Sequence, residues 1–156
     1  MLSRPPDSPS GATRLRDCPA LQVSYPSTRD RGAGQNVTLD GVIQDPAGDE
    51  GFRVGGWVGL IKDSPELNKL ALHEALGAEA LLLGRRSYEW FAARWPSRSG
   101  ELADRLNSLP KYVVSSTLED PAWNNSTVLD GDVLNEVSKL KRELDGEIVV
   151  PASFQL

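Results

Sequence analysis

The segment Gly84-Arg85-Arg86-Ser87 has residue types that could bind an anion. It follows a continuous apolar run, and a helical pattern begins directly after it. The first N–H groups of a helix lack partners, and the helix dipole is positive at that end. Arg85 and Arg86 add charge that matches a phosphate, and Ser87 adds a hydroxyl. The segment therefore predicts an anion-binding turn, with an ordinary strand-to-helix turn and solvated arginines as the alternative.

A second group of hydroxyls, Ser115, Ser116 and Thr117, follows a predicted strand at 111–114. Ligands of open α/β sheets bind outside the carboxyl ends of the strands, which is where these residues would lie. Serine and threonine also end many strands without binding anything. By itself this second group is a weak indication of a site.

One histidine and one cysteine limit the other chemistries that the chain can perform. A single cysteine excludes an internal disulfide and a cysteine-based zinc site, and a single histidine excludes a two-histidine metal site. His73 precedes Glu74, but the fourth residue after His73 is Gly77, so the paired-histidine zinc motif fails. We interpret His73 as a helical residue without a catalytic task and Cys18 as an inert thiol, and we expect no metal site.

Composition narrows the class of protein further. The length of 156 residues suits one domain, and the net charge of −5 argues against a general nucleic-acid binder. The sequence has no run of 18 apolar residues, and its first residues lack the apolar core of a secretory signal. We therefore expect a cytoplasmic protein with no nucleic-acid and no membrane partner.

Residues 1–34 differ from the rest of the chain. They are rich in proline and serine and carry five arginines against three aspartates. Such a stretch buries too little apolar surface to offset the entropy of ordering it, so we interpret it as a disordered arm. An arm that binds RNA or an acidic partner is the alternative. Residues 35–156 form the predicted domain.

Strands alternate with helices in that domain. A polar cap, Pro65 and Glu66 predict a helix start, and Gly77 predicts its end. The further predicted elements are a strand at 80–83, a helix capped by Ser87, a helix at 101–109, strands at 111–116 and 127–129, a helix capped by Asp132 and a strand at 147–150. This order predicts a largely parallel sheet with helices on its faces.

Five motifs occur along the chain in a characteristic order. They are Thr38-Leu39-Asp40-Gly41, Gly55-Gly56-Trp57, and the segments 82–88, 106–115 and 123–126. Together they resemble the dihydrofolate-reductase-like family, which shares its fold with the reductase domain of the bifunctional riboflavin-biosynthesis deaminase-reductase. The resemblance covers roughly residues 36–156. It implies a dihydrofolate-reductase-like α/β fold with a mixed, mostly parallel sheet flanked by helices, an NADPH site, and hydride transfer to a small molecule.

The resemblance also implies roles for the residues that match its motifs. Gly84, Arg85 and Ser87 would correspond to the turn that contacts the cofactor phosphates. Ser115 and Ser116 would lie near the 2′-phosphate of the adenosine. The family's fold would place these two groups at one cofactor site.

The remaining implied roles concern Asp40, Gly41 and Ser153. Asp40 and Gly41 would lie in the loop beside the nicotinamide, with Asp40 as a weak candidate for an acid or base. Ser153 would correspond to the serine of a Gly-Ser pair that holds cofactor phosphates. Here the preceding residue is Ala152, which adds a Cβ where backbone and phosphate should meet.

The chain also departs from the family at both ends. Residues 28–35 are polar where the family has an apolar first strand, and the sequence stops at Leu156. This pattern suggests a truncated reductase with a sheet that is incomplete at its C-terminal end. Three functions are therefore open: an NADPH-dependent reductase, an inactive truncated remnant, and a nucleotide-binding module without catalysis. Homodimers are common in proteins of this kind, so a homodimer is also open.

Overall fold

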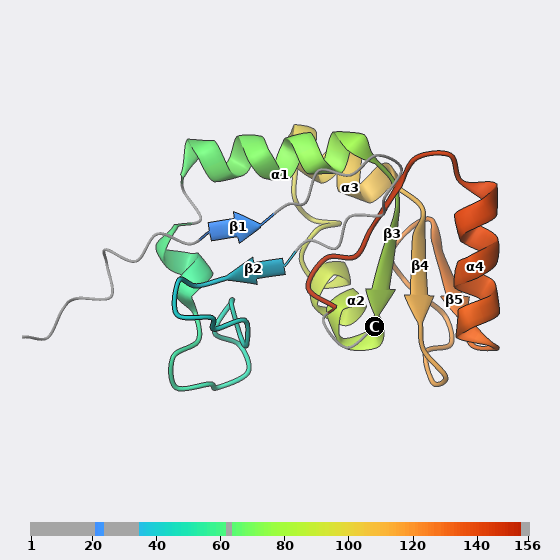
Figure 1. The fold of residues 1–156 in the computed structure, drawn as a ribbon, viewed down its shortest axis with the longest axis horizontal. Helices are drawn as coiled ribbons and strands as arrows, with labels where there is room; N and C mark the ends of the chain where they lie inside the picture. Colours follow the sequence, from blue (N-terminus) through green and yellow to red (C-terminus); the bar gives the residue numbers. More distant parts are fainter. Residues whose placement is uncertain (1–20, 24–34, 62–63, 154–156) are drawn as a thin grey trace, which may run out of the picture.

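A four-stranded parallel sheet, in the order β5-β4-β3-β6, lies at the centre of the structure (Figure 1). Its strands are β3 (Ala78–Gly84), β4 (Lys111–Val114), β5 (Ser126–Leu129) and β6 (Glu147–Val149). All three strand pairings are parallel. The prediction of an α/β fold with parallel strands flanked by helices is therefore confirmed.

The computed structural model describes residues 21–23, 35–61 and 64–153. The arm expected over residues 1–34 falls outside these ranges, except for β1 (Leu21–Val23). This strand pairs antiparallel with β2 (Gln35–Val37) in a separate two-stranded sheet. No helix in the described ranges has the length and apolar character needed to cross a membrane.

Helices cover both faces of the four-stranded sheet. They are α1 (Pro65–Gly77), α2 (Arg85–Ala92), α3 (Glu101–Ser108) and α4 (Val133–Glu143). Leu81 and Leu83 of β3 pack in one apolar cluster with residues of α1, α2 and α3. Leu82, between them, packs in the other cluster with Leu140 of α4. Because β3 is buried on both faces, its sequence is a continuous apolar run.

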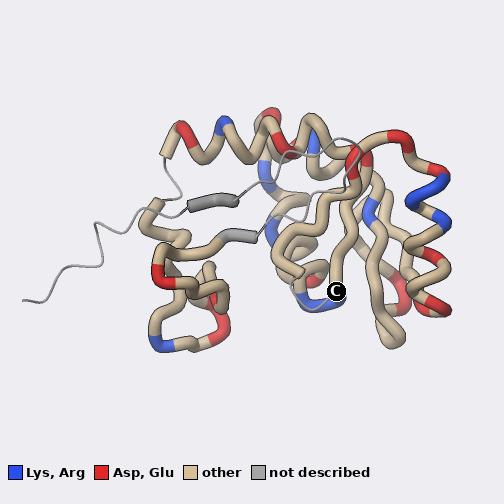
Figure 2. The backbone as a smooth tube through the Cα atoms, in the orientation of Figure 1, with Lys and Arg blue, Asp and Glu red and all other residues tan. Residues whose placement is uncertain are grey.

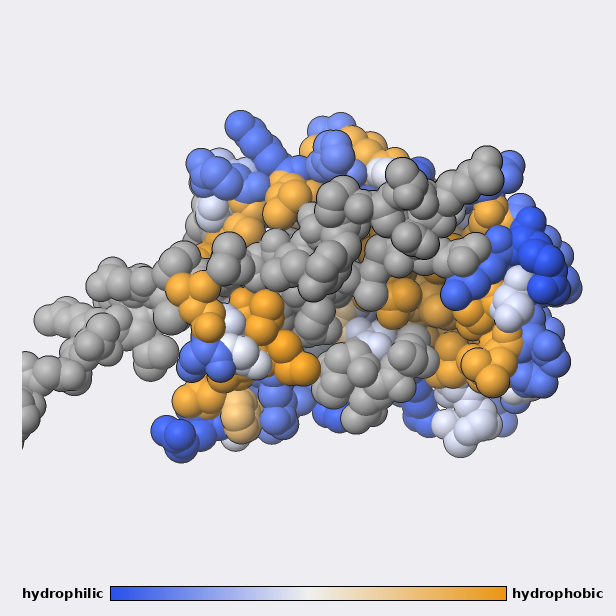
Figure 3. All heavy atoms as spheres, viewed as in Figure 1, coloured by the Kyte–Doolittle hydropathy of each residue, from blue (hydrophilic) through white to orange (hydrophobic). Residues whose placement is uncertain are grey.

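The helix α4 is amphipathic. Val137 and Leu140 pack against the sheet, whereas its lysines and glutamates are on the outer side. Figure 3 shows this polar surface at the right edge of the molecule, with apolar residues gathered beside it. The helix therefore forms the second covering layer of the sheet.

Local capping explains where two of the helices begin. The Ser64 side chain accepts a hydrogen bond from the backbone of Leu67 at the start of α1. The Asp132 side chain does the same for Asn135 at the start of α4, as predicted. These caps satisfy backbone N–H groups that the helix leaves unpaired.

The predicted cap of α2 is wrong. This helix begins at Arg85, with Gly84 as its N-cap and no side-chain cap hydrogen bond. Ser87 lies inside the first turn, and its hydroxyl donates to the carbonyl of Ala152, 65 residues away in the sequence. The Ser87 hydroxyl, which we expected to cap the helix, therefore forms a hydrogen bond with a residue distant in the sequence.

The core between α2, α3 and the sheet contains polar side chains with defined partners. The Tyr88 hydroxyl accepts from the backbone N–H of Trp123 at 2.9 Å, and the Trp123 indole donates to Asn107 at 2.7 Å. Lys111, which is 0% exposed, donates from Nζ to the carbonyls of Asn107 and Asn124. Burial lowers the pKa of Lys111 to about 8.

Candidate functional site

The carboxyl ends of β3 and β6 meet at the start of α2. The Gly84 backbone N–H donates to Ser153 Oγ at 3.1 Å, and Ser153 Oγ lies 3.0 Å from Ser87 Oγ. Ser87 in turn donates to the carbonyl of Ala152 at 2.8 Å. The structure thus brings together Gly84, Ser87 and Ser153, each of which the resemblance implies to contact cofactor phosphates.

Arg85 connects this cluster to the end of β4. Its guanidinium Nη1 donates to the Thr117 hydroxyl, and its Nε pairs with Glu89 Oε1 at 2.8 Å. Arg85 and Thr117 are 32 residues apart in the sequence. The two predicted groups of polar residues therefore meet at one edge of the sheet.

Ser115 shapes the turn that follows β4. Its Oγ accepts hydrogen bonds from the backbone N–H groups of Thr117 at 3.2 Å and Leu118 at 3.0 Å. This turn ends the strand at Val114, two residues earlier than the predicted strand at 111–116. Ser115 is 8% exposed, whereas Ser116 is exposed to solvent.

A hollow of about 370 Å³ lies beside these serines, between the ends of β4 and β5 and the start of α4. Its lining consists of Val114, Ser115, Ser116, Leu129, Asp130, Gly131 and Val133. Asp130 and Gly131 are not among the site residues expected from the sequence. They directly follow the predicted strand at 127–129, so the strand-end rule that indicated Ser115 could have indicated them too.

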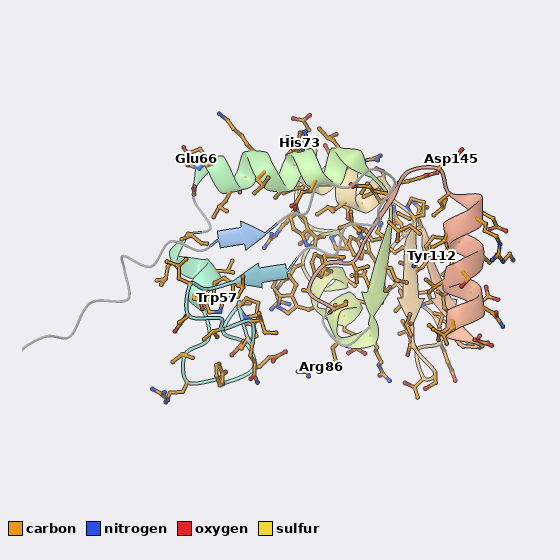
Figure 4. The ribbon with its side chains drawn as sticks, in the orientation of Figure 1. Trp57, Glu66, His73, Arg86, Tyr112 and Asp145 are labelled. Atoms are coloured by element: carbon orange, nitrogen blue, oxygen red, sulfur yellow. The ribbon has the colours of Figure 1, made fainter. Side chains whose placement is uncertain are left out.

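Charges are unevenly distributed along this edge of the sheet. Figure 2 shows basic positions at the start of α2 and acidic positions at the start of α4, both at the same end of the sheet. Arg86 points towards the loop over residues 45–56, where its Nη2 pairs with Glu50 Oε1 at 2.8 Å (Figure 4). Arg85 is therefore the arginine of this pair that contacts the end of β4.

The loop over residues 45–56 is held against α2 by acidic side chains. Asp49 Oδ2 accepts from the Trp90 indole at 2.8 Å and from Arg94 at 2.6 Å. The Arg94 guanidinium also lies 4.3 Å from the centre of the Trp90 ring. The motif Gly55-Gly56-Trp57 leads directly into a 3-10 helix (Trp57–Leu60), and Trp57 is buried.

Asp45 organises the same loop. Its carboxylate accepts from the backbone of Glu50 at 3.1 Å and of Phe52 at 3.0 Å, and Asp45 is 3% exposed. Burial acts to raise the pKa of Asp45, but the hydrogen bonds from the loop backbone outweigh burial and lower the pKa below its ordinary value. The charged carboxylate therefore stabilises the loop conformation.

Asp40 and Gly41 lie elsewhere in the structure. The Thr38 hydroxyl donates to Asp40 Oδ1, and the Gly41 N–H donates to the Thr38 carbonyl at 2.9 Å. Gly41 has a φ of +86°, which favours glycine. Figure 1 shows β2 running away from the four-stranded sheet before this turn. Across residues 35–61 and 64–153, no hydrogen bond joins Asp40 or Gly41 to the cluster around Arg85.

The gathered groups are suited to binding phosphate. They comprise a guanidinium, several hydroxyls and a backbone N–H, all of which donate hydrogen bonds to anions. His73 is exposed on α1, which lies at the opposite end of the sheet (Figure 4). The described part of the chain contains no group of three or more His, Cys, Asp or Glu side chains that could hold a metal ion.

A scan against models of known protein families found no match, and a search of curated proteins found no similar sequence. The class of this protein therefore rests on its own fold and site. It is an α/β protein with a parallel sheet and a polar, phosphate-compatible edge at the carboxyl ends of its strands.

Proposed function

We propose that this protein is an NADPH-dependent reductase that transfers hydride to a small molecule. The hydrogen bond from Arg85 to Thr117 is the observation that carries the proposal, because it joins the turn at 84–87 to the residue that follows Ser115 and Ser116, and the sequence resemblance assigns both groups to the cofactor. Both motifs lie at the carboxyl edge of a parallel sheet, where such folds bind nucleotides. The proposal includes a cytoplasmic location and leaves a homodimer open.

The residues at this edge fit the phosphate groups of NADPH. Arg85, Ser116 and Thr117 would hold the phosphate on the adenosine ribose, because a guanidinium and two hydroxyls are good ligands for it. Gly84 and Ser87 would hold the phosphates that link the two nucleosides. Their polar groups contact the turn over residues 151–153 in this structure, so a phosphate there would replace some of these contacts.

The cofactor itself would supply the hydride. The chain would supply charge and orientation, with Arg85 fixing the adenosine end of the cofactor at the edge of the sheet. The substrate would be a small molecule that accepts hydride, such as a carbonyl or pterin-like compound.

A nucleotide-binding module without catalysis is the second candidate. It is favoured by the contacts of Asp40, the only acid or base that the sequence resemblance suggests for catalysis. Asp40 accepts a hydrogen bond from Thr38, and among the described residues it has no hydrogen bond to the cluster around Arg85. Arg85, Ser87 and Ser153 are residue types suited to phosphate, and no histidine is among their hydrogen-bond partners in the described residues. This candidate predicts binding of NADPH without turnover.

Titration with NADPH, followed by tryptophan fluorescence, tests the proposed site. The variant Arg85→Glu should bind NADPH at least about tenfold more weakly, because a repulsive charge replaces a charge-assisted hydrogen bond. Arg142→Glu is the matched control, since Arg142 is an exposed arginine in the last turn of α4. Equal binding by Arg85→Glu and the unchanged protein would show that this edge is not the site.

Consumption of NADPH separates the two candidates. The unchanged protein should oxidise NADPH in the presence of at least one carbonyl or pterin-like compound from a screen, and Arg85→Glu should lose that activity. Tight binding without oxidation across the screen favours the binding module. Absence of both binding and oxidation contradicts both candidates and favours an inactive protein.

A further inference from the structure

The turn over residues 151–153 uses hydrogen-bond donors that the proposed phosphate site needs. The backbone N–H of Gly84 donates to Ser153 Oγ at 3.1 Å, and the Ser87 hydroxyl donates to the Ala152 carbonyl at 2.8 Å. Each of these groups has a single proton to donate. The phosphates that link two nucleosides only accept hydrogen bonds, so they and the turn compete for the same donors.

The hydroxyl of Ser153 does not replace the donors that the turn occupies. Its proton is directed to Ser87 Oγ at 3.0 Å or to the Pro151 carbonyl at 3.2 Å, and both acceptors belong to the same closed arrangement. Its oxygen meanwhile accepts from the Gly84 N–H. Ser153 Oγ therefore occupies the position at the start of α2 that a phosphate oxygen would take.

The backbone of Ala152 is in a conformation that alanine seldom adopts. Its φ is +51°, in the left-handed region that is unfavourable for a residue with a Cβ. Backbone strain of this kind persists only where surrounding contacts hold it, and it is found at segments that switch between two states. Here the hydrogen bonds to Gly84 and Ser87 hold the turn closed, whereas the strain at Ala152 favours opening.

The sheet does not depend on the closed turn. Val149, the last residue of β6, pairs with Leu81 of β3, and Val149 and Val150 pack against the two apolar clusters. Ala152 is exposed to solvent, so its side chain has little packing to lose. An opening movement that begins after Val150 therefore leaves β6 in place.

We infer that the turn over residues 151–153 is an autoinhibitory contact, which closes the phosphate site and must open before the linking phosphates of the cofactor bind. This inference rests on the proposed function, because the ligand is taken to be NADPH. It reverses the role that the resemblance implies for Ser153, which here holds the site closed and does not hold phosphate. The measured affinity is then the affinity of the open form multiplied by the fraction of molecules that are open.

The variant Ser153→Ala tests the contact by titration with NADPH, followed by tryptophan fluorescence. It frees the Gly84 N–H and removes the contact with Ser87, so it should bind NADPH about fivefold more tightly, the effect of losing one ordinary hydrogen bond from the closed form. Ser99→Ala makes the same substitution in an exposed loop and should bind like the unchanged protein. A serine that binds phosphate directly would give the opposite result, so weaker binding by Ser153→Ala would overturn the inference.

Two substitutions of Ala152 test the closed backbone conformation itself. Proline fixes φ at about −65°, which is incompatible with the closed turn, so Ala152→Pro should also bind NADPH at least about fivefold more tightly. Ala152→Gly is the matched comparison, because glycine adopts a positive φ and keeps the turn closed. It should bind no more tightly than the unchanged protein. An equal rise in Ala152→Gly would overturn the inference, because the Cβ of Ala152 would then be what limits binding.

The remaining outcomes separate the closed turn from the reductase proposal, and urea unfolding of each variant verifies that it folds. Equal binding of NADPH by the unchanged protein, Ser153→Ala and Ala152→Pro would overturn the inference and leave the proposed function intact. If NADPH binds to none of them, the proposed function fails, and inorganic pyrophosphate becomes the probe. Tighter binding of pyrophosphate by both variants would support a closed anion site. Absence of pyrophosphate binding would overturn the inference as well.

Discussion

The backbone N–H of Gly84 donates a hydrogen bond to the hydroxyl of Ser153 at 3.1 Å. This contact connects the end of β3 to the turn that follows β6. It places a hydroxyl at the start of α2, a helix with no side-chain cap of its own. The turn over residues 151–153 therefore does for α2 what Ser64 and Asp132 do locally for α1 and α4.

Ser153→Ala should destabilise the folded protein. The variant leaves the Gly84 N–H without this partner and removes the contact with Ser87, at a cost of about 1 kcal/mol. Urea unfolding measures the loss as a lower midpoint with an unchanged slope. Ser99→Ala, at an exposed loop position, is the control and should leave the midpoint unchanged. An unchanged midpoint in Ser153→Ala would mean that the hydroxyl contributes nothing to the start of α2.

NADPH should raise the stability of the unchanged protein. A ligand that binds only the folded state adds about 2.7 kcal/mol when its free concentration is 100 times its dissociation constant. The four tryptophans of the chain provide the signal, and Trp57 and Trp123 among them are buried. A cooperative transition that moves to higher urea supports a folded protein with a cofactor site. A shallow curve that NADPH does not shift would instead indicate an inactive protein.

Local signals were enough to predict most of the elements. The continuous apolar run of β3 indicates a strand that is buried on both faces. The starts of α1 at Pro65 and of α4 after Asp132 depend on capping hydrogen bonds between residues only three positions apart. The start of α2 was mispredicted because the partner of Ser87 lies 65 residues further along the chain. Only the folded arrangement shows such a contact.

The candidate site was also predictable only in part from the sequence. Parallel strands place their carboxyl ends at one edge, so strand order alone suggests that Arg85 and Ser116 lie close together. The hollow beside Asp130 depends on how α4 packs on the sheet, and no local pattern reports this. The hydrogen bonds from Trp90 and Arg94 to Asp49 join segments that are more than 40 residues apart. Neither segment carries a local pattern that predicts this contact.

Asp45→Asn should loosen the loop over residues 45–56. An asparagine offers one acceptor oxygen, whereas the Asp45 carboxylate accepts from both Glu50 and Phe52. Hydrogen exchange of the amides at residues 48–56 should become faster in the variant at neutral pH. Asp120→Asn, at an exposed turn, is the control. Unchanged exchange in Asp45→Asn would show that the carboxylate does not hold the loop.

The lowered pKa of Asp45 determines how the contribution of its carboxylate to stability changes with pH. Its folded-state pKa lies below the ordinary value of 3.8, so the contribution is complete above pH 3.8 and is lost as the pH falls through the lower, folded-state pKa. The difference in unfolding free energy between the unchanged protein and Asp45→Asn should therefore shrink in acid. A difference that stays constant down to pH 2 would contradict this origin.

Lys111 should make the protein more stable as the pH rises above 8. Burial lowers the pKa of its amine to about 8 in the folded state, whereas an unfolded lysine has a pKa of 10.5. Between these values the unfolded chain binds more protons than the folded protein, so the free energy of unfolding increases with pH. Urea unfolding at several pH values from 7 to 10.5 measures the slope.

The variant Lys111→Met assigns that slope to one residue. Methionine has a similar length and no charge, so it should remove the rise in stability between pH 8 and 10.5. It also leaves the carbonyls of Asn107 and Asn124 without a donor, and this loss lowers stability equally at every pH in that range. The slope, and not the absolute stability, therefore reports the titration of Lys111. A slope that persists in Lys111→Met would mean that the amine remains charged in the folded protein, stabilised by the two carbonyls and by the Trp123 ring 4.2 Å away.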